Sequence, residues 1–181
     1  MNNFITSGTW DCGEPERKRM EAAMNAVKGE SVLDIGTRDG TFALTLAQAH
    51  PQMRVTGFYT DASSIAWANQ KADELGLTNV TLYELDIFDP KTKAVLGEHA
   101  YDTVLIMETL EHLSPNRVQE ANDIAESFVK KGGRLIVTVP SSSHISDPDH
   151  KQTFYREYIM SPDKVWLKDC PHLWIGWYSD L

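Results

Sequence analysis

The sequence has few cysteines, no long apolar run and a deficit of positive charge. Its two cysteines, Cys12 and Cys170, are too few for a disulfide scaffold, which indicates a reduced, cytoplasmic setting. No run approaches the ~20 apolar residues of a transmembrane helix, and residues 1–7 lack the basic start and apolar stretch of a signal peptide. With 17 Lys and Arg against 26 Asp and Glu, the net charge of −9 disfavours nucleic acid as a partner and membrane association is not predicted.

The chain also lacks internal repeats, low-complexity linkers and the G-x-x-x-x-G-K-[ST] motif of P-loop nucleotide-binding proteins. Its 181 residues, 41% of them hydrophobic, predict a single domain over residues 1–181. What the sequence does contain is an alternation of apolar runs and helical patterns. Strands are predicted at 32–35, 55–58, 80–85, 102–107, 135–139 and 174–178, and helices at 15–28, 41–49, 61–75, 118–129 and 152–167.

Several predicted strands are apolar without alternation, as in 104–107 and 135–137. Strands of this kind are buried on both faces, which is typical of a parallel sheet covered by helices. The alternation of strands and helices therefore predicts an α/β fold with a doubly wound, mostly parallel sheet. In such a fold the ligand lies at the carboxyl ends of the strands, near the point where the strand order reverses.

The run from Val32 to Gly40 joins the first strand to a helix through a turn with two glycines. Gly36 allows the backbone to turn and to approach a ligand closely, because it has no Cβ atom. A strand, a glycine turn and a helix in this order also bring backbone N–H groups and a helix N-terminus beside one pocket. Arg38 stands where a middle glycine is expected, so the motif by itself indicates nucleotide binding only weakly.

Polar side chains follow all five of the first predicted strands, and many of them are acidic. Such a set suits a ligand with ribose hydroxyls, a ring amine and an ammonium group. In order and spacing, residues 30–140 resemble the seven-stranded S-adenosylmethionine-dependent methyltransferases. The matching segments are Val32–Gly40, Val55–Tyr59, Glu84–Ile87, Tyr101–Leu113 and Lys130–Pro140.

The resemblance implies S-adenosylmethionine as cofactor and a Rossmann-like methyltransferase fold. It also implies a role for each matching position. Asp34 is expected to hold the methionine ammonium, Gly36 and Thr37 to lie against the methionine and ribose, and Tyr59 to stand at the ribose. Asp86 is expected to accept a hydrogen bond from the adenine amine, Ile87 to contact the adenine, and Glu108 to stand beside the sulfonium.

The sequence departs from the family pattern in two further ways. At the end of the second strand the family usually has an acidic residue that binds both ribose hydroxyls, whereas this chain has Tyr59. Asp61 is near enough to compensate, and it is equally suited to cap the following helix. After Val139 only one clear strand remains, so the C-terminal part of the sheet is expected to be shortened or completed by a very short strand.

The segment Glu108-Thr109-Leu110-Glu111-His112 supports two different hypotheses. On a helix, positions 108, 111 and 112 would share one face. His112 is then the candidate catalytic base, because imidazole is suited to accept a proton near neutral pH. In the other hypothesis Glu108, Glu111 and His112 bind a divalent metal together with His150, a pattern similar to that of small-RNA 3′-terminal 2′-O-methyltransferases.

The main hypothesis is a methyltransferase that acts on a small-molecule acceptor without a metal. Two alternatives remain, a non-catalytic methyltransferase-like binding or regulatory module and the metal-assisted RNA 2′-O-methyltransferase. A nicotinamide-dependent dehydrogenase is disfavoured, because the second strand does not end in an acidic residue and G-x-G-x-x-G is incomplete.

Overall fold

A computed structural model describes residues 14–140, 148–154, 164–166 and 173–179 of the chain. The strands are β1 (Ser31–Ile35), β2 (Arg54–Tyr59), β3 (Val80–Glu84), β4 (Tyr101–Met107), β5 (Val129–Pro140), β6 (Lys164–Trp166) and β7 (Leu173–Ser179). The α-helices are α1 (Glu14–Ala26), α2 (Thr41–Ala49), α3 (Ala62–Glu74), α4 (Pro90–Leu96) and α5 (Val118–Phe128), with 3₁₀ turns η1 (Leu110–His112) and η2 (Pro115–Arg117).

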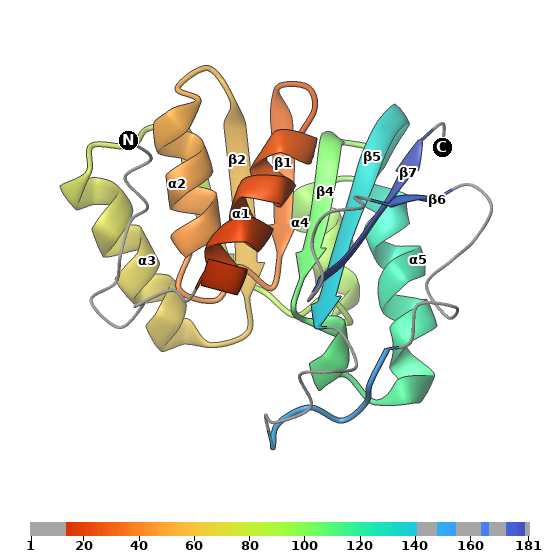
Figure 1. The fold of residues 1–181 in the computed structure, drawn as a ribbon. Helices are drawn as coiled ribbons and strands as arrows, with labels where there is room; N and C mark the ends of the chain where they lie inside the picture. Colours follow the sequence, from red (N-terminus) through yellow and green to blue (C-terminus); the bar gives the residue numbers. More distant parts are fainter. Residues whose placement is uncertain (1–13, 141–147, 155–163, 167–172, 180–181) are drawn as a thin grey trace.

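The strands form one seven-stranded sheet in the order β3-β2-β1-β4-β5-β7-β6 (Figure 1). Strands β1 to β5 run parallel to one another, and β7 is antiparallel to both β5 and β6. The chain moves outward from β1 to β3 and then returns to the other side of β1 with β4. This reversal confirms the doubly wound α/β fold predicted from the alternating pattern.

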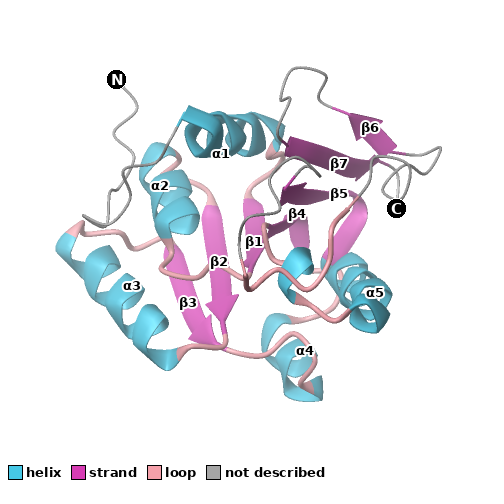
Figure 2. Cartoon of the chain, turned by 60° about the horizontal axis from the view of Figure 1, so that its bottom comes forward, coloured by secondary structure: helices cyan, strands magenta, loops and turns pink. Residues whose placement is uncertain are grey.

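Helices cover both faces of the sheet, as Figure 2 shows. Helices α1, α2 and α3 pack on one face, and α4 and α5 pack on the other. All five residues of β1 are buried. Val32 belongs to the core under α1–α3, whereas Leu33 and Ile35 belong to the core under α4 and α5. No helix in the described part of the chain is long and apolar enough to cross a membrane.

The C-terminal part of the sheet differs from the prediction. It is not shortened, because the three-residue strand β6 pairs with β7 and completes a seven-stranded sheet, which is the other outcome that the sequence left open. The helix predicted over 152–167 is wrong where the chain is described. Residues 152–154 are irregular and 164–166 form a strand, because pairing with β7 overrides the local helical pattern. The remaining residues of that predicted helix, 155–163 and 167, lie outside the described residues.

The amino ends of the central strands are joined by the carboxylate of Asp102 in β4. Its Oδ2 accepts hydrogen bonds from the Glu30 amide at 3.0 Å, the Ser31 amide at 2.9 Å and the Ser31 hydroxyl at 2.7 Å. Its Oδ1 pairs with the Lys130 ammonium of β5 at 2.8 Å. Burial opposes ionisation, but the bonds from Lys130, Ser31 and Glu30 outweigh it and hold the pKa of Asp102 well below its usual range.

We expect Asp102→Asn to lower the free energy of unfolding by about 2–3 kcal/mol, because hydrogen bonds to a charged group each contribute ~1.5–3 kcal/mol. The measurement is urea denaturation at pH 7. Glu74→Gln is the matched control, since Glu74 loses only an exposed ion pair with Lys71. If both variants unfold at the same urea concentration as the parent, Asp102 does not hold the sheet together.

Candidate functional site

The carboxyl ends of β1, β2 and β4 meet at one edge of the sheet, which comes forward in Figure 2. Strand β1 lies between β2 and β4, so the strand order reverses there. Asp34 and Gly36 lie at the end of β1, Tyr59 at the end of β2, and Glu108 directly after β4. The structure therefore places these predicted residues at the point where the strand order reverses, the usual ligand position in this kind of sheet.

The turn after β1 is held tightly against β2. Gly36 has φ +79°, and a Cβ atom there would collide with the hydroxyl of Thr109, so only glycine fits. Arg38 also has a left-handed backbone, with φ +54°. The amides of Gly36 and Thr37 both donate to the Phe58 carbonyl at 3.0 Å. These two N–H groups are consequently engaged within the protein, so they are not free to donate to a ligand.

Asp34 is a buried carboxylate with an incomplete set of hydrogen bonds. Only 2% of the residue is exposed, and among the described residues its Oδ2 atom has no hydrogen-bond partner. Burial raises the pKa of Asp34 to about 6. The nearby Thr37 hydroxyl offsets only part of this rise, and it does not meet the geometry of a hydrogen bond. A group in this state gains most from a cationic partner supplied by a ligand.

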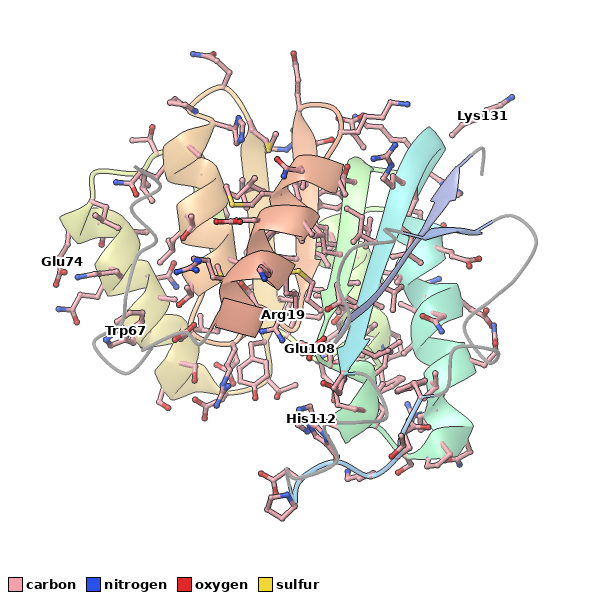
Figure 3. The ribbon with its side chains drawn as sticks, viewed as in Figure 1. Arg19, Trp67, Glu74, Glu108, His112 and Lys131 are labelled. Carbon is pink, nitrogen blue, oxygen red and sulfur yellow. The ribbon has the colours of Figure 1, made fainter. Side chains whose placement is uncertain are left out.

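Glu108 is fixed by contacts from two elements, β5 and α1. Its φ of +46° is unusual for a residue with a side chain, and it turns the backbone at the end of β4. The Thr138 hydroxyl donates to Glu108 Oε1 at 2.9 Å, and Arg19 of α1 pairs with Oε2 at 2.9 Å. Figure 3 shows Arg19 reaching Glu108 from the lower end of α1. Sequence analysis did not identify Arg19, because no local pattern indicates where α1 docks.

The two residues considered for the ribose have different surroundings. Tyr59 is half-buried and packs against the core under α1–α3. Asp61 caps α3, since its carboxylate accepts from the Ser64 amide at 2.8 Å and the Ser63 hydroxyl at 2.6 Å. These bonds lower the pKa of Asp61. The structure thus shows the capping role of Asp61, and its carboxylate is occupied by that role.

Asp86 and Ile87 follow β3 at the same edge of the sheet. Asp86 is exposed and accepts a hydrogen bond from the Phe88 amide at 2.9 Å. Ile87 is half-buried and packs against the core under α4 and α5. The guanidinium of Arg117 lies 3.7 Å from the centroid of the Phe88 ring, which ties the start of α5 to this loop.

The residues around His112 correct the predicted metal set. Glu108 precedes a short 3₁₀ turn rather than lying on a helix, so it does not share a face with Glu111 and His112. Ligand atoms of Glu111, His112 and His150 lie within 4.8 Å of one another, and Glu108 is not among them. The four-residue set is therefore wrong, and a three-residue cluster takes its place.

The other histidines that the sequence offered lie elsewhere. His99 is exposed in the loop before β4, at the opposite end of the strand. His144 and the loop over residues 141–147 lie outside the described residues.

Residues 26–172 match the family described as methyltransferase domain. The chain belongs to this family. The methyltransferase resemblance identified in the sequence is thereby confirmed.

Proteins similar to this chain are named for different methyl acceptors. The structure of magnesium protoporphyrin IX methyltransferase from Synechocystis PCC 6803 with bound S-adenosylhomocysteine is similar, with a TM-score of 0.70, 18% identity and coverage of 92% of this chain and 84% of that one. The (S)-tetrahydroprotoberberine N-methyltransferase of Eschscholzia californica is 33% identical over 85 residues, 47% of this chain and 23% of the relative. A tRNA (guanine-N(7)-)-methyltransferase of Thermus thermophilus is 26% identical over 159 residues, 78% of this chain and 48% of the relative. The chain thus spans less than half the length of either curated relative.

The described residues fit the methyl donor of the family. The donor carries an ammonium group, and Asp34 offers a buried carboxylate oxygen without a hydrogen-bond partner. It also carries a carboxylate, and Arg19 brings a guanidinium to the same edge of the sheet. Gly36 has no Cβ atom, which leaves room for the Thr109 side chain beside the turn.

We expect the stability of the ligand-free protein to fall between pH 4 and pH 6. Because the folded-state pKa of Asp34 is raised from 3.8 to about 6, the folded protein binds more protons than the unfolded chain in this range. Ionising Asp34 in the folded state therefore costs about 3 kcal/mol above pH 6.

Asp34→Asn removes this cost. Relative to the parent, the variant should gain about 3 kcal/mol of stability between pH 4 and pH 7.5, measured by urea denaturation at both pH values. An identical pH dependence in the parent and the variant would contradict the raised pKa.

Proposed function

We propose that this chain transfers a methyl group from S-adenosylmethionine to a small-molecule acceptor. The observation that supports the proposal most is the buried Asp34 carboxylate, which lies at the strand reversal beside the Gly36 turn and has an oxygen available for a cation. A small acceptor is favoured over RNA because the chain has a net charge of −9. One relative is named for N-methylation of a tetrahydroprotoberberine.

The residues near the carboxyl ends of the strands each have a proposed task in binding the donor. Asp34 holds the ammonium group, and Arg19 holds the carboxylate while it remains paired with Glu108. Gly36 and Thr37 form the surface under the methionine and ribose. The ribose and adenine are held by Tyr59, Asp86 and Ile87.

When bound, the donor supplies a methyl group on a positively charged sulfur. The acceptor atom attacks the methyl carbon in line with the departing sulfur. The protein contributes orientation and removal of the acceptor's proton. His112 is the proposed base that accepts this proton. Its Nδ1 lies 3.3 Å from the Asp149 carbonyl, which only accepts hydrogen bonds, so Nδ1 carries hydrogen and Nε2 of the neutral ring is the basic atom.

The test of donor binding is calorimetry with S-adenosylhomocysteine at pH 7.5. The parent should bind, and Asp34→Asn should bind about 10–100-fold more weakly, since hydrogen bonds to a charged group contribute ~1.5–3 kcal/mol. Asp61→Asn is the control and should match the parent, because Asp61 is engaged at the start of α3. Equal affinity in the parent and Asp34→Asn, or no binding to the parent, would overturn the assignment.

The test of proton removal is the rate of S-adenosylhomocysteine formation with a panel of small hydroxyl and amine acceptors. For an acceptor that the parent methylates, His112→Ala should lower the rate by about 10²–10⁴-fold and leave the affinity for S-adenosylhomocysteine unchanged. His50→Ala changes an exposed histidine after α2 and should have no effect. A His112→Ala variant with the parent's rate would show that His112 does not act on the acceptor.

A further inference from the structure

Three side chains able to bind metals converge from two segments of the chain that are far apart in sequence. Glu111 and His112 belong to η1 after β4, and His150 belongs to the segment 148–154. One carboxylate oxygen and one nitrogen from each imidazole lie within 4.8 Å of one another. The two rings meet edge to face, with centroids 5.1 Å apart. Figure 3 shows His112 below Glu108, beyond the carboxyl end of β4.

The segment that carries His150 is fastened to η1 by hydrogen bonds from the two residues that follow the histidine. The Lys151 amide donates to the Glu111 carbonyl at 2.9 Å. The Gln152 amide group donates to the carbonyls of Leu110 at 3.0 Å and Leu113 at 3.1 Å. The approach of His150 to Glu111 is therefore built into the fold, and the three groups need little rearrangement to act together.

The contact of His112 with the backbone orients its ring as in a metal ligand. Nδ1 faces the Asp149 carbonyl at 3.3 Å and carries the hydrogen, which leaves the lone pair of the neutral ring on Nε2. Histidines that bind metals usually donate the other ring N–H to a carbonyl or carboxylate in this way, which fixes the tautomer and the direction of the ring.

Glu111 is a buried carboxylate, and a cation beside it would stabilise its ionised form. The residue is 1% exposed, yet its carboxylate faces two imidazoles that are neutral in their metal-binding form. Burying an ionised carboxylate is costly unless a cation lies beside it. A divalent ion between the three groups would supply that charge and use both nitrogen lone pairs.

We propose that Glu111, His112 and His150 bind a divalent transition-metal ion of the zinc, cobalt and nickel class. Two nitrogen ligands and one oxygen ligand favour these ions over magnesium, which prefers oxygen ligands. Three protein ligands leave coordination positions open to water or to an acceptor oxygen, whose pKa the ion would lower. Glu108 takes no part, because its carboxylate is paired with Arg19 and Thr138.

The metal site stands on its own geometry, and only its use for methyl transfer rests on the proposed function. While an ion is bound, the Nε2 lone pair of His112 is a ligand and does not take a proton. An acceptor hydroxyl bound to the ion, with its pKa lowered, would then give its proton to solvent water. His112 thus removes the proton directly in the metal-free protein and acts through the ion in the loaded one.

The experiment uses the full chain, purified without a histidine tag and stripped of metal with a chelator. Titration with Co²⁺ is followed by visible absorption, and titration with Zn²⁺ by calorimetry. The parent should bind one ion per chain and show the absorption bands of a low-symmetry cobalt site. The His150→Ala variant should bind at least about 100-fold more weakly, because one of three protein ligands is lost. The His50→Ala variant should match the parent, since it loses an exposed imidazole at the end of α2.

Two additional readouts separate this proposal from others. In thermal unfolding, added Zn²⁺ should raise the melting temperature of the stripped parent and leave that of the stripped His150→Ala variant unchanged. S-adenosylhomocysteine should bind both proteins equally, so failure of donor binding and failure of metal binding are recorded independently. Equal metal affinity in the parent and His150→Ala, or no saturable binding to the parent, would overturn the metal site.

Discussion

The carboxylate of Asp102 joins the three strands on which the rest of the molecule is built. It binds the backbone at the start of β1 and the ammonium of Lys130 in β5, while its own backbone belongs to β4. Thr103 adds to the same junction, because its hydroxyl exchanges hydrogen bonds with the backbone of Lys28 at 2.7 and 2.9 Å. With the amino ends of these strands held in register, the ends of β1 and β4 emerge side by side at the opposite edge of the sheet.

The two ends of the central strands each carry a carboxylate, and the pKa values of these two groups are shifted in opposite directions. At the amino end, Asp102 accepts several hydrogen bonds, and its pKa lies well below the usual range. At the carboxyl end, Asp34 is buried with an oxygen that has no hydrogen-bond partner among the described residues, and its pKa is raised to about 6. A carboxylate whose oxygens accept hydrogen bonds stabilises the fold. A buried carboxylate with an oxygen that accepts none lowers the stability of the ligand-free protein, and a cationic ligand that binds it relieves this cost. The candidate site therefore depends on the stability supplied at the other end.

Local sequence signals were sufficient for most of the fold and for the placement of several site residues. The apolar runs of β1 and β4, the Gly36 turn and the Asp61 cap are all encoded within a few residues, and each is found as predicted. Helix α4 was missed although Asp89 and Pro90 are a recognisable helix start. Features that depend on contacts between residues far apart in the sequence could not be predicted from local patterns. Neither the strand at 164–166, the contact of Arg19 with Glu108 nor the approach of His150 to Glu111 leaves a local pattern. The expected helix face at 108–112 failed because Glu108 adopts a left-handed backbone that ends the strand.

The position of β7 constrains the order in which the molecule can be completed during synthesis. It lies between β5 and β6 and is antiparallel to both, so residues 173–179 must be available before either neighbour is fully paired. Until then β5, a strand of 12 residues, presents an unpaired edge of backbone N–H and C=O groups. An emerging chain with such an edge is prone to pair with other chains. Correct assembly of the sheet therefore requires β7 to pair with β5 before another chain does.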